Sequence, residues 1–154
     1  MIRILGQPTD PERLSYVNPK LELRSKRNGE KGLFATKAIR RREIVSISAG
    51  IGVPLEFVKR LPKEIQRFCY YVENGMFYCP LTRRPSPEWF MNHSCHPNVS
   101  SPREAFTLRA LRNIAAGEEV SYDYGEDYCF DRYRPFRRFR CHCGAADCRK
   151  TVRY

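Results

Sequence analysis

The stretch Trp89-Phe90-Met91-Asn92-His93-Ser94-Cys95-His96-Pro97-Asn98 decides how the rest of this sequence is interpreted. Short polar side chains follow directly on three apolar ones, and the thiol of Cys95 lies two positions from the imidazole of His93. A thiol close to an imidazole suits either a metal site or a nucleophile. We favour the metal site, because residues this close in sequence seldom point at each other as a nucleophile and its base must.

Three more cysteines lie within eight residues further along, in the pattern Cys141-x-Cys143-x4-Cys148. Structural zinc takes four ligands in a tetrahedron and prefers thiolates, so this knuckle needs a fourth ligand from elsewhere. The spacing alone leaves open which residue that is, the candidates being Cys95, Cys129, His142, Cys69 and Cys79. Zinc bound here would contribute folding energy to the segment around the knuckle.

The bulk composition indicates one basic domain with reduced thiols. A length of 154 residues suits a single domain, and seven cysteines, an odd number, fit a metal better than a disulfide framework. The formal net charge of +11 indicates an acidic partner, although it also serves solubility alone. We find neither a signal peptide nor an apolar run of membrane-spanning length, so we expect an intracellular protein, nuclear or cytoplasmic, with no membrane partner.

Hydrophobic periodicity and turn residues predict short strands, a few helices and proline-rich connections. Alternating residues predict a strand at Leu21–Arg24, and Asn28-Gly29 predicts the turn after it. The other expected strands are 33–35, 44–50, 76–79 and 119–124, and the expected helices are 54–61 and 63–72. Taken alone, 119–124 is predicted as an edge strand with two aromatics.

Three stretches resemble, in order and spacing, the motifs of SET-domain protein-lysine methyltransferases. They are Asn92-His93-Ser94-Cys95, Gly117-Glu118-Glu119-Val120-Ser121-Tyr122-Asp123-Tyr124-Gly125 and the cysteine knuckle. The resemblance implies a mixed, mainly β, SET-domain (β-clip) fold with a threaded C-terminal segment and a small zinc-binding post-SET tail. The boundaries it implies are a lead-in at 1–19, a SET domain at 20–128 with a short insert at 53–88, and the tail at 129–154. No cysteine-rich module precedes the motifs, unlike in several histone-directed members.

The same resemblance implies two cofactors, S-adenosylmethionine as methyl donor and zinc. Glu30, Lys31 and Gly32 match the glycine-rich turn that binds S-adenosylmethionine through its main chain, and Asn92 and His93 match further cofactor contacts. Many members carry an aromatic where this chain has Lys31, and the lysine would attract the cofactor's carboxylate instead. The zinc ligands that the resemblance names are Cys95, Cys141, Cys143 and Cys148.

The implied reaction is displacement of a methyl group from a sulfonium by a lysine amine. A free lysine with a pKa near 10.4 is almost wholly protonated at neutral pH, and releasing its proton costs about 4–5 kcal/mol. The site must therefore favour the neutral amine by desolvation and by the nearby sulfonium charge. Tyr124 matches the family's active-site tyrosine, which orients the methyl and the amine. Tyr122 leaves less room than a phenylalanine would, which favours mono- or dimethylation.

The sequence leaves the substrate protein and the oligomeric state open. A histone is one candidate, and another basic or nucleic-acid-associated protein is a second. One alternative function is a non-catalytic SET-like module that binds a protein partner. The other is a zinc-knuckle module that binds nucleic acid, which the Arg-, Phe- and Tyr-rich stretch 128–140 would also suit.

Overall fold

The computed structural model describes residues 15–48, 50–66, 68–73, 75–80, 86–100, 107–124 and 138–153. Most of the predicted lead-in, the candidate ligand Cys129 and most of the aromatic stretch 128–140 lie outside these residues. The elements are β1 (Tyr16–Val17), β2 (Leu21–Ser25), β3 (Lys31–Ala35), β4 (Ile44–Ile47), β5 (Gly50–Pro54), α1 (Leu55–Arg60), α2 (Lys63–Gln66), β6 (Tyr70–Glu73), β7 (Met76–Pro80), a 3-10 helix (Pro87–Phe90), β8 (Asn92–His93), β9 (Val99–Ser100), β10 (Thr107–Ala110), β11 (Glu119–Tyr122), β12 (Arg138–Arg140) and β13 (Thr151–Arg153).

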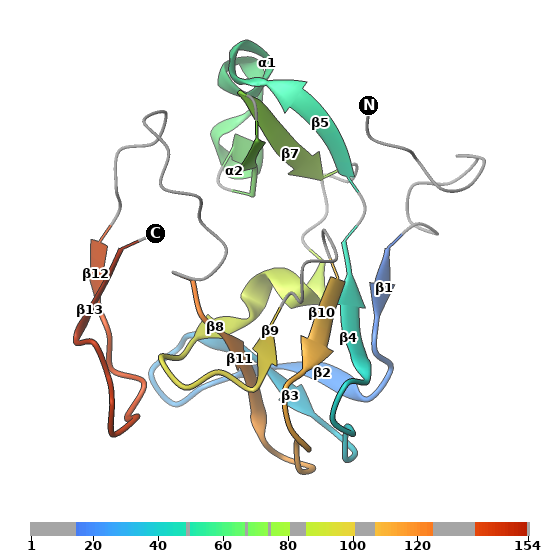
Figure 1. The fold of residues 1–154 in the computed structure, drawn as a ribbon, viewed down its shortest axis with the longest axis vertical. Helices are drawn as coiled ribbons and strands as arrows, with labels where there is room; N and C mark the ends of the chain where they lie inside the picture. The colour runs from blue at the N-terminus through green and yellow to red at the C-terminus, as the bar shows by residue number, and fades with distance from the viewer. Residues whose placement is uncertain are drawn as a thin grey trace.

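Four small sheets make up the described part of the chain (Figure 1). Two have four strands, in the orders β1-β4-β10-β9 and β2-β3-β11-β8. A three-stranded sheet, β5-β7-β6, lies with α1 and α2 at one end of the molecule in Figure 1, and the hairpin β12-β13 lies to the side. Within the described ranges, no helix is long and apolar enough to cross a membrane.

The two four-stranded sheets share one hydrophobic core. Its fully or almost fully buried members are Leu33, Ala35, Ile39, Val45, Met91, Val99, Ala110, Ile114 and Val120. Met91 immediately precedes the polar residues of β8, and Val120 lies in the middle of β11. The strands that carry the polar motifs are therefore anchored on the core by their apolar neighbours, because burial of these side chains removes apolar surface from water.

Strand β11 lies inside its sheet, between β3 and β8, so the predicted edge strand at 119–124 is corrected. It pairs antiparallel with β3 and parallel with β8, with Ser121 opposite Asn92 and Tyr122 opposite His93. The strand ends at Tyr122, and Tyr124 lies just beyond it. The segment alternates polar and apolar residues, which indicates which side chains share a face of the sheet but not whether a second strand pairs with its other edge.

The region of the predicted insert has a small sheet and core of its own. Two elements expected in and next to it were wrong in extent or type. The expected helix 63–72 stops at Gln66, and Tyr70–Glu73 is instead a strand paired with β7. Two consecutive tyrosines and a valine suit a strand, and pairing with β7 overrides the helical spacing. The expected strand 44–50 is also divided, because β4 ends at Ile47 and Gly50 already belongs to β5. Gly50 packs so closely on Tyr78 that a Cβ would overlap its ring.

Candidate active site and thiol cluster

The two polar motifs meet through the buried side chain of Asn98. Its Nδ2 donates to the main-chain oxygen of Glu119 at 2.8 Å and to Glu118 Oε1 at 3.0 Å, and its Oδ1 accepts from the N–H of Ser121 at 2.9 Å. The main-chain N–H groups of Ser94 and Asn98 donate in turn to the carbonyls of Tyr122 and Ser121. The stretch from Glu118 to Tyr122 is therefore hydrogen-bonded to the loop that follows β8.

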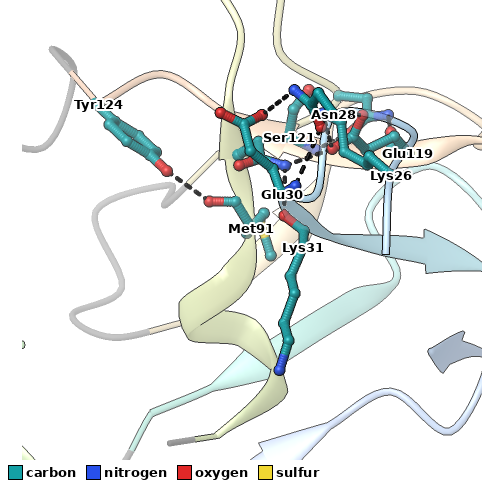
Figure 2. A network of polar contacts seen from close by, with 10 residues as sticks. Lys26, Asn28, Glu30, Lys31, Met91, Glu119, Ser121 and Tyr124 are labelled. Carbon is teal, nitrogen blue, oxygen red and sulfur yellow. Dashed lines mark hydrogen bonds and ion pairs between the residues drawn. The ribbon is translucent and has the colours of Figure 1, made fainter. Parts of the chain in front are cut away.

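Tyr124 lies at the end of this bound segment, among aromatic rings. Its hydroxyl donates to the main-chain oxygen of Met91 at 2.7 Å (Figure 2). Its ring centroid lies 4.8 Å from that of Tyr122, 5.3 Å from that of His93 and 5.9 Å from that of Phe139. The structure thus brings together the two tyrosines that the sequence singled out, and adds Phe139 from β12.

His93 connects Tyr124 to the thiol cluster. Its Nδ1 accepts the main-chain N–H of Tyr124 at 3.1 Å, and its Nε2 lies 3.3 Å from Cys95 Sγ. Because Nδ1 is the acceptor, the proton of the neutral ring belongs on Nε2, which then donates to the sulfur. Burial lowers the pKa of His93, as does Arg149, against the opposing effect of Asp123. The imidazole is accordingly neutral at neutral pH.

Of the predicted cofactor-binding residues, Glu30 ends the turn that joins β2 to β3, and Lys31 and Gly32 begin β3. Gly29 takes the positive φ of +83° that a tight turn needs, and the side chains of Asn28 and Glu30 hydrogen-bond to each other. In Figure 2 the Lys31 side chain extends away from the polar cluster, and its ammonium lies 5.2 Å from the centroid of the Phe90 ring. Lys31 reaches Asn92 through its main-chain oxygen, which accepts from Asn92 Nδ2 at 3.0 Å.

Gly32 lies where side chains from three elements converge. A Cβ at this position would be 2.6 Å from Glu119 Oε1 and 3.2 Å from Asn92 Nδ2. Those two atoms are hydrogen-bonded at 2.6 Å, and Lys26 Nζ forms an ion pair with Glu119 at 3.0 Å. A side chain at this position would therefore displace the Glu119 carboxylate, so the glycine matters here for close approach and not for its backbone angle.

The four thiols named by the resemblance lie together. The sulfur atoms of Cys95, Cys141, Cys143 and Cys148 all lie within 4.8 Å of one another, and those of Cys95 and Cys141 are 3.8 Å apart. A tetrahedral zinc site with Zn–S bonds of about 2.3 Å requires sulfur atoms about 3.8 Å apart. Main-chain N–H groups also point at sulfur, from Cys95 to Cys143 and from Arg149 to Cys95. The donor set and its spacing fit a tetrathiolate metal site.

The pKa values of two thiols differ in direction. Burial raises the pKa of Cys141 to about 12. Burial acts in the same sense on Cys143, but hydrogen bonds from the main-chain N–H groups of Cys95 and Ala145, together with the neighbouring thiols, lower its pKa to about 6. Of these two thiols, Cys143 is thus the more readily available as a thiolate.

Sequence reasoning missed three residues that hold this region together. The Arg149 guanidinium forms an ion pair with Asp123, next to Tyr124. Phe139 packs its ring against His93, with centroids 5.3 Å apart, and Lys26 pairs with Glu119. Phe139 belongs to the aromatic stretch 128–140 that the sequence singled out, although no single residue in it was named. Lys26 and Arg149 each come from a segment distant in sequence, and a lone Lys or Arg in a basic chain carries no pattern that could have identified it.

Comparison with known proteins gives one family. Residues 30–125 match the SET domain family. Histone-lysine N-methyltransferase 2D of Homo sapiens is 30% identical over 131 residues, which cover 79% of this chain and 2% of that protein. The Saccharomyces cerevisiae histone-lysine N-methyltransferase, H3 lysine-4 specific, is 29% identical over 136 residues, which cover 77% of this chain and 12% of that protein. The chain thus spans only a small part of the length of these relatives.

A solved structure supports the same fold. The crystal structure of KRYPTONITE in complex with mCHG DNA and SAH aligns with a TM-score of 0.60 at 23% identity, over 85% of this chain and 28% of that one. At this identity the likeness concerns the fold alone, and it confirms the predicted mainly β SET-type architecture. With the family match over 30–125, which includes the paired motifs of β8 and β11, the chain belongs to the SET-domain family.

Proposed function

We propose that this chain transfers a methyl group from S-adenosylmethionine to the side-chain amine of a protein lysine. The observation that carries the proposal is the position of Tyr124. It follows the strand paired with Asn92 and His93, it is surrounded by aromatic rings, and its hydroxyl is fixed on the Met91 carbonyl at 2.7 Å. When bound, S-adenosylmethionine supplies the methyl group as part of a sulfonium cation.

The role of Tyr124 is to orient the reacting groups. Because its O–H donates to the Met91 carbonyl, the oxygen can act only as an acceptor toward a substrate. An acceptor suits an amine N–H and a methyl group that carries partial positive charge. Desolvation beside the rings of Tyr122 and Phe139, together with the positive charge of the sulfonium, would promote the neutral lysine that must attack. Alignment of the amine, the methyl group and the sulfur would contribute further to the rate.

Tyr122 is our candidate for setting the degree of methylation. Its ring centroid lies 4.8 Å from that of Tyr124, so its hydroxyl takes up space that a phenylalanine would leave empty. We infer mono- or dimethylation. Tyr122→Phe should shift the products toward trimethyllysine, measured by mass spectrometry of a methylated peptide, and an unchanged product distribution would contradict this role.

The cofactor would bind between the turn and β8. Glu30 comes from the end of the turn and Lys31 and Gly32 from the start of β3, and Asn92 and His93 come from the strand that Lys31 contacts through its main chain. The predicted ammonium contact of Lys31 with the cofactor's carboxylate requires the side chain to leave the Phe90 ring. Such a cation–π contact is worth only about 0.5–1 kcal/mol at an exposed site, so that exchange is cheap.

We assign zinc to the thiol cluster, with Cys95, Cys141, Cys143 and Cys148 as its ligands. Zinc there is structural, because four protein thiolates leave no open position for a substrate. Cys95 belongs to the loop after β8, and the other three belong to the segment between β12 and β13. Bound metal would therefore tie β12, which carries Phe139, to the strand that carries His93.

For the substrate, the names of the relatives favour a histone, and hence a nuclear protein. Both relatives described above are named histone-lysine methyltransferases. The net charge of +11 suits a basic histone tail poorly, so a protein bound to nucleic acid stays a second candidate.

Radiolabelled methyl transfer tests the proposal. Zinc-loaded protein and its Tyr124→Phe variant are incubated with labelled S-adenosylmethionine and, separately, core histones and a ribosomal protein fraction. We expect label on one fraction with wild type and a loss of at least about a hundredfold with the variant, at unchanged cofactor affinity by calorimetry. If the folded wild-type protein binds no cofactor and labels neither fraction, the enzymatic function is refuted in favour of a binding module.

A further inference from the structure

Lys26, Glu119 and Asn92 form a continuous polar chain beside Gly32. Lys26 Nζ lies 3.0 and 3.1 Å from the two carboxylate oxygens of Glu119, and Glu119 Oε1 accepts from Asn92 Nδ2 at 2.6 Å. In Figure 2, Lys26 and Glu119 lie together beside Asn28, away from the Tyr124–Met91 contact. Neither Lys26 nor Glu119 has a role in the function proposed above.

These contacts determine which way the Asn92 carboxamide faces. Its nitrogen has two N–H donors, and both are used: one on Glu119 Oε1 and one on the Lys31 main-chain oxygen at 3.0 Å. If the amide were turned over, its Oδ1 would face two acceptors and no donor. Nδ2 is therefore held toward Glu119 and the Lys31 main chain, and Oδ1 faces away from these two acceptors. Among the described residues, Oδ1 accepts no hydrogen bond that would compete with a ligand.

We propose that Glu119, with Lys26 as its counter-ion, is a positioning residue that fixes Asn92 so that Oδ1 receives the ammonium group of S-adenosylmethionine. The inference rests on the proposed function, because the ammonium belongs to that cofactor's aminocarboxypropyl arm. An outward carbonyl oxygen selects a hydrogen-bond donor, and a cationic donor binds it most strongly.

The local geometry explains why three residue types occur together here. Gly32 leaves the space that the Glu119–Asn92 pair occupies, since a Cβ would be 2.6 Å from Glu119 Oε1. Lys26 neutralises Glu119, so the carboxylate holds the amide without adding net charge to the site. Each of the Lys26 and Glu119 side chains is 29% exposed, so solvent screens their ion pair in part.

Calorimetry with two ligands tests the role. S-adenosylhomocysteine carries the aminocarboxypropyl arm, and 5′-methylthioadenosine lacks it. The zinc-loaded chain and its variants Glu119→Ala, Glu119→Gln, Lys26→Met and Asn92→Ala are titrated with each, and so is the double variant Glu119→Ala/Asn92→Ala. Glu56→Ala is the matched control, because it removes an exposed ion pair with Lys59 on α1.

We expect Glu119→Ala to lower the affinity for S-adenosylhomocysteine about tenfold and the affinity for 5′-methylthioadenosine by less than about twofold. Glu119→Gln keeps an acceptor oxygen and should restore most of the affinity, while Lys26→Met should give a smaller loss than Glu119→Ala. The double variant should bind no more weakly than Asn92→Ala alone, because both changes act on one contact. Glu56→Ala should match wild type.

Several results would overturn the positioning role while leaving the proposed function intact. They are an unchanged affinity in Glu119→Ala, an equal loss for both ligands, additive losses in the double variant, or a larger loss in Lys26→Met than in Glu119→Ala. The last would make Lys26 a direct ligand. If the folded wild-type chain fails to bind S-adenosylhomocysteine at all, the proposed function fails and the positioning role fails with it.

Discussion

Replacing Asn98 by alanine should be among the most destabilising single changes in the sheet that carries the candidate site. The side chain is 2% exposed and makes three hydrogen bonds, to Glu118, Glu119 and Ser121. At about 1 kcal/mol for each bond, the change costs about 3 kcal/mol. The main-chain groups of Glu119 and Ser121 would also lose a partner, so the loss should not be smaller. In a chain of this length, that corresponds to a fall in Tm of about 6–12 °C.

Thermal and urea unfolding, followed by circular dichroism in excess zinc, measure this loss. Asn113→Ala is the matched control, because that exposed asparagine accepts one hydrogen bond, from the N–H of Arg41, and should cost less than about 1 kcal/mol. If Asn98→Ala loses less than about 1 kcal/mol, or no more than Asn113→Ala, the reasoning is refuted. Asn98 would then not be what holds β11 against the loop after β8.

Three further predictions concern binding, pH and metal. Gly32→Ala should cost less than about 1 kcal/mol of stability, because the flexible end of Glu119 can move, and yet weaken the binding of S-adenosylhomocysteine. Thermal melts measure the stability and calorimetry the affinity. A fall in stability as large as the fall in binding free energy would contradict this prediction. Hydrogen bonds from Lys20, the Arg40 main chain and Asn18 lower the pKa of Glu43 from 4.5 to about 2. That stabilisation is complete above the unfolded-state pKa and is lost as pH falls toward about 2, so Glu43→Gln should flatten the decline of urea midpoints between about pH 5 and pH 2. Chelation should expose the β12–β13 hairpin to trypsin before the core, as mass spectrometry of early fragments would show; simultaneous cleavage would argue against a structural metal confined to the tail.

The sequence predicted the parts of the fold and site that depend on local pattern. The strand at Leu21–Arg24, the turn at Gly29 and the helix after Pro54 follow from alternation, glycine and proline, and all are present. The grouping of Cys95 with the knuckle came from the resemblance, since spacing alone left several candidates. The structure brings those four thiols together.

What the sequence could not predict depends on pairing between distant segments. Tyr70–Glu73 has helical spacing with the residues before it, and only the neighbouring β7 makes it a strand. The interior position of β11 follows from its parallel partner β8, which is two residues long and too short to detect by period. Lys26 became visible as part of the site only once Glu119 was placed beside it.

The long sequence separations within the site have a consequence for how the chain folds. Lys26 and Glu119 are 93 residues apart, and Cys95 and Cys141 are 46 residues apart, whereas the β2–β3 hairpin closes locally between Leu21 and Ala35. Contacts between distant residues carry the larger loop-closure entropy and slow folding. The hairpin can therefore form early, and the site should be assembled in the last, rate-limiting step. A partly folded chain would then carry correct hairpins and no site, so the amount of active protein recovered after refolding should report completion of the whole topology.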